Sequence, residues 1–286
     1  MNSRRILITG AGSGIGLETA LELFHRGHQV IGIIRNQKKF NAMWKERSTE
    51  PPPFSIINFD VTDEKKAATA VARILKEGPV DVLINNAGYG QYGCFEELPG
   101  SDYRQQFETN VFGLMQMTRL VLPSMRKRGR GSILNVSSIL GRVALPTGTP
   151  YCSSKWAVSG FTRALRFELA PLGIQVCGVE PGLIRTSFKA NMQLSPDQAN
   201  SDSPYAPYNR MIADEIKEYG RMSTDVRTAA RRMASLAEKE RLPSTFRIGL
   251  DAKLTYAITR ILPESWLDVV FRMASGKIYK KYSTAR

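Results

Sequence analysis

The sequence predicts an α/β fold in which one parallel β-sheet is covered by helices on both faces. Short apolar segments alternate with helix-like segments from residue 5 to about residue 179. Strands that alternate with helices form parallel sheets, and strands buried on both faces are apolar along their whole length. The length of 286 residues is sufficient for one large domain with a complete core. We therefore expect a single doubly wound domain that spans residues 1–286.

The expected strands follow one another along the chain, and helices fill the intervals. Leu17, Ala20, Leu21 and Phe24 recur at helical spacing after the first strand, and Gly27 marks the end of that helix. Three prolines at 51–53 exclude a helix there and predict a surface loop before the third strand. The expected strands, about seven in number, are residues 6–9, 30–34, 55–59, 80–84, 133–136, 174–179 and 245–248.

Beyond residue 182 the alternation breaks. Residues 183–222 mix aromatic and other apolar side chains with three prolines, which fits either a mobile lid over a binding site or an ordinary long loop. Residues 224–238 have a helical pattern. Residues 250–286 form a basic amphipathic extension, which could pack as a final helix, cover a pocket or lie weakly on an anionic membrane surface. Of these three, we favour packing.

Composition excludes several classes of protein. Hydrophobic residues make up 42% and charged residues 23%, as in ordinary globular proteins. No apolar run approaches the roughly 20 residues of a membrane span, and the N-terminus runs directly into a strand, so we expect a cytoplasmic location. Three widely spaced cysteines and two histidines predict neither disulfides, nor a metal site, nor a Ser-His-Asp triad.

The chain is strongly basic, with a formal net charge of +14. Such a charge indicates an anionic partner, which would be a phosphate-bearing cofactor, a membrane surface or nucleic acid, while a solvated basic surface is the simple alternative. No nucleic-acid-binding module is recognisable, and basic runs are not interleaved with aromatic residues. We therefore expect no nucleic-acid partner.

A glycine-rich loop follows the first strand and opens the first helix. Gly10, Gly14 and Gly16 lie in it, with Ser13 and Ile15 between them, so its spacing differs from G-x-G-x-x-G. Small residues let the backbone approach a pyrophosphate, and the free N–H groups at a helix start favour its charge. The loop predicts a dinucleotide site, with a simple tight turn as the alternative.

Further candidate site residues stand where the later strands end. In parallel sheets these ends meet at one edge, where ligands bind, so we expect the residues to converge on one crevice. They are Arg35, Asp60, Val61, Asn86, Ala87, Gly88, Ser138, Pro181, Gly182, Ile184 and Thr186.

Tyr151 and Lys155 begin the helix after the fifth strand. Four residues apart, their side chains share one helix face. A tyrosine ordinarily has a pKa of about 10, too high for easy proton transfer near neutral pH, and a neighbouring ammonium favours its phenolate form. Lys155 is placed to supply that charge. An unremarkable pair on a surface helix is the alternative.

Taken together and in this order, these motifs resemble the short-chain dehydrogenase/reductase family over residues 4–190. The C-terminal part resembles hydroxysteroid-dehydrogenase-like members. The resemblance implies a Rossmann fold and a nicotinamide-dependent oxidoreductase that interconverts a carbonyl and an alcohol. It further implies that Tyr151 transfers the proton, Ser138 binds the substrate oxygen and Lys155 holds the nicotinamide ribose. Asn110 would anchor a water-mediated proton path to Lys155.

The resemblance also implies how the cofactor lies. Asp60 would contact the adenine, residues 86–88 would lie beside the adenosine ribose, and Ile184 and Thr186 would meet the nicotinamide. Val61, Pro181 and Gly182 are further expected cofactor contacts. Where an NAD-preferring site carries an acid, this chain has Arg35, and the planar guanidinium suits a 2′-phosphate. NADP(H) is therefore favoured over NAD(H), unless Arg35 is only solvated surface.

Apolar loop residues near the expected site, including Tyr92, Leu140 and Phe188, predict a hydrophobic small-molecule substrate such as a steroid, a retinoid or an acyl compound. Packing in the core is the alternative for these residues. A homodimer or homotetramer is expected from the resemblance. A non-catalytic dinucleotide sensor or scaffold on the same fold stays open, because fold alone does not fix function.

Overall fold

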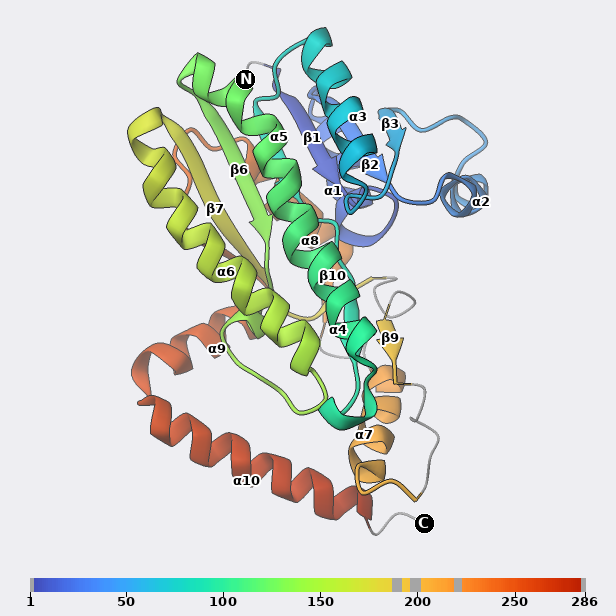
Figure 1. The fold of residues 1–286 in the computed structure, drawn as a ribbon, viewed down its shortest axis with the longest axis vertical. Coiled ribbons are helices and arrows are strands. Elements are labelled where there is room, and N and C mark those ends of the chain that lie inside the picture. The colour runs from blue at the N-terminus through green and yellow to red at the C-terminus, as the bar shows by residue number, and fades with distance from the viewer. Residues whose placement is uncertain (1–2, 187–191, 196–201, 219–222, 284–286) are drawn as a thin grey trace.

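A seven-stranded parallel sheet forms the centre of the molecule (Figure 1). The computed structural model describes residues 3–186, 192–195, 202–218 and 223–283. The strand order is β11-β7-β6-β4-β1-β2-β3, and every pairing in it is parallel. The strands are β1 (Arg5–Thr9), β2 (Gln29–Ile34), β3 (Ser55–Asn58), β4 (Val82–Asn85), β6 (Gly131–Val136), β7 (Ile174–Pro181) and β11 (Thr245–Ile248). The predicted fold class is confirmed, and the strand ends differ from the prediction by a few residues.

Two layers of helices cover the two faces of this sheet. On one face lie α1 (Gly14–His25), α2 (Gln37–Arg47) and α8 (Val226–Ala237), packed into one apolar cluster. On the other lie α3 (Glu64–Glu77), α5 (Gly113–Arg128) and α6 (Thr149–Leu169). Strand β1 is apolar along most of its length because its side chains are buried on both faces of the sheet. Ile6 and Ile8 belong to the first cluster and Leu7 to the second, and all three are fully buried.

Helices α2, α3 and α8 begin with side-chain caps, whereas α1 at the glycine-rich loop does not. The Asp63 carboxylate accepts from the backbone N–H of Lys66 at 3.0 Å before α3, and Asp225 accepts from Arg227 before α8. Ser13, the residue before α1, makes no side-chain hydrogen bond to that helix, and the first turn of α1 holds no acidic residue. The amides at the start of α1 are therefore left for another acceptor.

Residues 183–222 contain regular structure rather than one long loop. Strand β8 (Ile184–Arg185) pairs with β10 (Thr224–Asp225), and β9 (Met192–Leu194) pairs with β5 (Gly90–Tyr92). Helix α7 (Ala206–Glu218) follows. The reading as an ordinary loop is thus wrong for the described part of the segment, whereas its role as a lid stays a prediction.

The C-terminal extension forms two helices. Helix α9 (Leu250–Ile261) follows β11, and α10 (Glu264–Ser283) extends from it to α7 (Figure 1). No helix in the described part of the chain is both long enough and apolar enough to cross a membrane.

Candidate functional site

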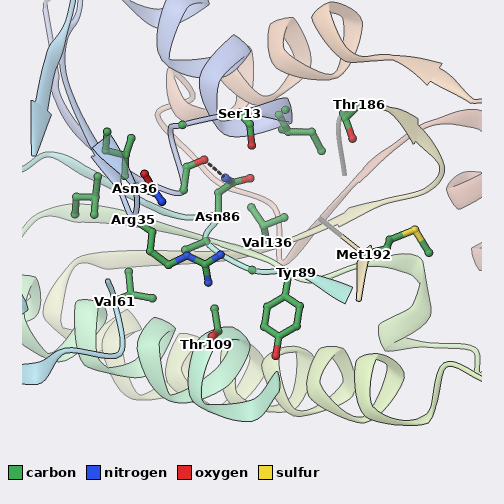
Figure 2. A pocket seen from close by; sticks show the side chains of 18 of the residues that line it. Ser13, Arg35, Asn36, Val61, Asn86, Tyr89, Thr109, Val136, Thr186 and Met192 are labelled. Carbon is green, nitrogen blue, oxygen red and sulfur yellow. Dashed lines mark hydrogen bonds between the residues drawn. The ribbon is translucent and has the colours of Figure 1, made fainter. Parts of the chain in front are cut away.

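A pocket of about 570 Å³ lies where the sheet strands end (Figure 2). Its wall is built from the ends of β1, β2, β3, β4, β6 and β7 and the segments that follow them, together with the start of α6. The predicted site residues that line it are Gly10, Ser13, Gly14, Ile15, Arg35, Asp60, Val61, Asn86, Ala87, Gly88, Ser138, Tyr151, Lys155, Pro181, Gly182, Ile184 and Thr186. Parallel topology thus brings residues that follow six strands to one cavity, and α6 adds Tyr151 and Lys155.

The glycine-rich loop allows a close approach of backbone to backbone. Gly10 has a φ of +68°, and a Cβ there would lie 2.8 Å from the Cα of Ala87. Ser13, Gly14 and Ile15 form the pocket wall at the start of α1. Uncapped amides and the positive end of a helix dipole suit a phosphate, so this part of the wall fits the pyrophosphate of a dinucleotide.

Gly16 does not line the pocket, and its role as a cofactor contact stays a prediction. A Cβ at Gly16 would lie 2.3 Å from the carbonyl oxygen of Gly10 and 2.4 Å from Nδ2 of Asn86. That nitrogen donates to the carbonyl oxygens of Thr9 and Gly10, at 3.1 and 3.2 Å. Gly16 therefore holds α1 against the loop from behind, and the site depends on it through packing.

We expect Gly16→Ala to lower the free energy of unfolding by about 1–3 kcal/mol, since its methyl group meets backbone that cannot move aside. Gly160→Ala in α6 is the matched control, because a Cβ there has no heavy atom within 4 Å. The control should stabilise the helix by about 0.5–1 kcal/mol. Urea unfolding of both variants measures the difference, and equal stability of the two would contradict this packing role.

Arg35 and Asp60 occupy the end of the pocket formed after β2 and β3. Figure 2 shows the Arg35 side chain extending into the cavity, and its Nε lies 3.9 Å from Oδ2 of Asp60. The Asp60 carboxylate is held by Thr62, whose backbone N–H and hydroxyl donate to it at 3.0 and 2.8 Å. Lys39 also lines this end. Two exposed cations thus face the cavity, and an anionic group is the ligand that they would attract.

Tyr151, Lys155 and Ser138 meet at the other end of the pocket. The Nζ of Lys155 lies 5.6 Å from the centre of the Tyr151 ring and donates to the carbonyl oxygen of Val136 at 3.0 Å. Burial lowers the pKa of Lys155 to about 8, because desolvation disfavours its charged form. Near neutral pH most of the lysine is still protonated, so a positive charge lies beside the tyrosine ring.

Ser138 begins the short 3₁₀ helix η3 (Ile139–Gly141), and its buried hydroxyl accepts from the backbone N–H of Leu140 at 3.1 Å. A hydroxyl that accepts one hydrogen bond still carries its own proton. Ser138 can therefore donate to an oxygen atom in the pocket.

Asn110 lies behind the pocket wall rather than in it. It belongs to a π-helix, η2 (Glu108–Phe112), that joins α4 (Gly100–Phe107) to α5. Its amide bonds the backbone N–H and carbonyl of Tyr89 at 3.1 and 3.0 Å, and the Ser154 hydroxyl at 3.2 Å. A Cβ at Gly88 would lie 2.9 Å from Oδ1 of Asn110 and 3.7 Å from Nζ of Lys155. Asn110 thus fixes the loop that flanks Lys155.

Of the three predicted substrate residues besides Ser138 and Tyr151, two do not line this pocket. The Tyr92 ring is tilted against that of Tyr151, with 5.6 Å between ring centres, and lies beside the cavity. Leu140 is half-buried next to Ser138. Phe188 lies outside the described residues.

Two wall residues, Met192 and Gln193, had no signal in the sequence that placed them in the wall. Met192 and Gln193 reach the pocket on β9, whose pairing with β5 joins segments a hundred residues apart. Tyr89 lines the wall (Figure 2), and its buried hydroxyl has no hydrogen-bond partner among the described residues. Burial, and secondarily the charge of Asp102, raises the pKa of Tyr89 to about 12, so it stays neutral.

Comparisons with known proteins agree on one family. The family model described as short chain dehydrogenase matches residues 4–197. A relative from Bacteroides thetaiotaomicron, named 3-ketodihydrosphingosine reductase, is 34% identical over 96% of this chain and 98% of its own. A short-chain dehydrogenase from Streptomyces avermitilis has 31% identity and a TM-score of 0.79, covering 99% of this chain and 98% of its own. An actinorhodin polyketide ketoreductase with NADPH also has 31% identity, with a TM-score of 0.70 over 86% of this chain and 96% of its own.

Proposed function

Because this chain belongs to the short-chain dehydrogenase/reductase family and is an oxidoreductase acting on CH–OH groups, we propose that it interconverts a hydrophobic carbonyl compound and its alcohol with NADP(H), using Tyr151 as general acid and base. The observation that carries this proposal is the position of the Lys155 ammonium, 5.6 Å from the Tyr151 ring centre in the wall of the pocket. Nothing in the geometry favours the non-catalytic alternative.

The residues of the pocket fit a nicotinamide dinucleotide. The uncapped start of α1 would bind its pyrophosphate, Asp60 and Val61 its adenine, and residues 86–88 its adenosine ribose. Lys155 would hold the nicotinamide ribose, with Ile184 and Thr186 beside the nicotinamide. When bound, the cofactor supplies or accepts the hydride.

The chain's own residues handle the proton. In the reducing direction the Tyr151 hydroxyl gives its proton to the substrate oxygen, and in the oxidising direction the phenolate takes one back. The ammonium of Lys155 favours the phenolate that remains. Ser138 donates a hydrogen bond to the same substrate oxygen and so fixes its position and stabilises the charge that develops on it.

Arg35 is the residue proposed to select NADP(H). We expect Arg35→Gln to raise the Kd for NADPH by about 10- to 100-fold and to change that for NADH less than about threefold, because only NADPH carries the 2′-phosphate that the guanidinium would bind. Lys38→Gln is the control, since Lys38 is exposed nearby but does not line the pocket. Equal loss of both cofactors in Arg35→Gln would contradict the assignment, and fluorescence titration measures it.

A hydrophobic substrate is supported by apolar side chains around the reactive end. Leu145 and Leu183 are exposed, Leu183 directly follows Gly182 of the pocket wall, and Tyr92 lies against Tyr151. One relative's name states that it reduces a ketone. The test is NADPH oxidation measured across steroid, retinoid, acyl and small aromatic carbonyls. We expect bulky apolar carbonyls to have the higher kcat/KM, and a clear preference for small polar carbonyls would contradict this.

We also propose that the chain forms a homodimer or homotetramer. Phe112, Trp156 and Phe167 are at least half exposed on η2 and α6, an aromatic surface that a second copy would cover. Light scattering of the purified protein should give a multiple of 31.9 kDa, and a monomer at all concentrations would contradict it.

A further inference from the structure

Helix α9 exposes an apolar stripe to solvent. Leu250, Leu254, Ile258 and Ile261 recur at intervals of four, four and three residues, which places them on one helix face, and each is between 49% and 78% exposed. Ala252 is the buried residue of this helix. Burying four such side chains removes a large apolar area from water, so this face has a strong tendency to bind an apolar surface.

Helix α10 repeats the pattern and then turns basic. Trp266, Val270 and Met273 share one face and are each more than half exposed, and Lys277 follows on the same face. Other positions hold α10 on α7. The hydroxyls of Tyr208 and Ser275 are 2.7 Å apart, and Arg210 donates to the carbonyl oxygen of Tyr282. The helix is thus fixed to the protein by its C-terminal half, while the apolar face of its N-terminal half remains uncovered by the described chain (Figure 1).

Both helices also carry exposed basic side chains. Lys253, Arg260, Arg272 and Lys277 are all exposed. Residues 250–283 contain six Lys or Arg against three Asp or Glu, within a chain of net charge +14. Apolar residues on one side and cations beside them are typical of helices that lie in the headgroup layer of an anionic bilayer.

From this combination we infer that α9 and α10 dock onto the surface of an anionic lipid bilayer. The alternative partner for this apolar surface is a second copy of the chain. In a two-fold interface the same face meets itself, so the basic residues of the two copies would be brought close together, which is unfavourable. Anionic headgroups instead attract each of them. The charges therefore favour lipid.

The test is sedimentation of the full-length protein, with NADPH, together with vesicles at low salt. We expect binding to vesicles of equal parts phosphatidylglycerol and phosphatidylcholine, little binding to pure phosphatidylcholine, and release at high salt. Ile261→Glu and Trp266→Glu should each weaken binding by about tenfold or more. Leu172→Glu is the matched control. It introduces the same charge at an exposed apolar residue just before β7, whereas α9 follows the opposite end of the parallel sheet.

The basic residues are tested separately. The double variant Arg260→Glu/Lys277→Glu should weaken vesicle binding by about tenfold or more. Lys76→Glu/Lys127→Glu changes the net charge equally at the last turns of α3 and α5, and should bind nearly as the unchanged protein does. The rise in melting temperature that NADPH produces verifies that each variant is folded.

Two results would overturn the inference. One is an unchanged protein that stays in the supernatant with anionic vesicles at low salt. The other is Ile261→Glu and Trp266→Glu variants that bind vesicles as the unchanged protein does. If light scattering also showed that these two substitutions dissociate an oligomer, the apolar face would instead be an interface between copies of the chain.

Discussion

Replacing Tyr151 with phenylalanine should lower turnover by about 10²- to 10⁴-fold, the contribution of a positioned acid and base, while the Kd for NADPH stays nearly unchanged. The phenyl ring keeps the packing against Tyr92, so only the hydroxyl is lost. Stopped-flow reduction of the best carbonyl in the substrate screen, together with fluorescence titration of NADPH, separates turnover from binding. A variant that turns over as fast as the unchanged enzyme would overturn the assignment of Tyr151.

Tyr92→Phe is the control for this experiment. Tyr92 lies beside the same ring at 5.6 Å but is not part of the pocket wall. Loss of its hydroxyl should therefore leave kcat nearly unchanged. If Tyr92→Phe cost as much turnover as Tyr151→Phe, the proton donor would have to be sought on β5 instead.

The Lys155→Met variant should turn over more slowly by a similar factor, and it should be more stable than the unchanged protein at neutral pH. Burial lowers the pKa of Lys155 from 10.5 to about 8, so below pH 8 the folded state holds a desolvated ammonium. A shift of this size corresponds to a penalty of about 3 kcal/mol, reduced by the hydrogen bond to Val136 that methionine cannot make. We expect a net gain in the free energy of unfolding of about 1–3 kcal/mol at pH 7.

The direction in which stability changes with pH follows from where the Lys155 proton is bound. Between pH 8 and 10.5 the unfolded chain binds the Lys155 proton and the folded chain has released it. The stability of the unchanged protein should therefore rise with pH across this window relative to Lys155→Met, and the difference between them should shrink. Urea unfolding at several pH values measures it. A variant that is less stable at pH 7, with a pH-independent difference, would show that the lysine is not desolvated.

Much of the site could be predicted because its residues follow strands directly. The glycine loop after β1, Asp60 after β3 and Ser138 after β6 are local signals, and parallel topology alone brings strand ends together. The spacing of Tyr151 and Lys155 likewise predicted a shared helix face, and the structure places the two side chains together.

What could not be predicted depends on contacts between distant segments. The role of Gly16 depends on Asn86, which lies seventy residues later in the chain. The position of Asn110 depends on one π-turn, which no local residue pattern indicates. Met192 and Gln193 enter the wall only because β9 pairs with β5. In the C-terminal helices the sequence showed an amphipathic pattern, but exposure on both helices became evident only in three dimensions.

A crystal structure with NADP⁺ and an alcohol substrate would show whether Tyr151 and Ser138 hold the reacting oxygen. We expect the pyrophosphate at the start of α1 and the substrate oxygen within hydrogen-bond distance of both Tyr151 and Ser138, with the reacting carbon facing the nicotinamide. A nicotinamide ring bound away from Tyr151, with the substrate oxygen held by other residues, would contradict it.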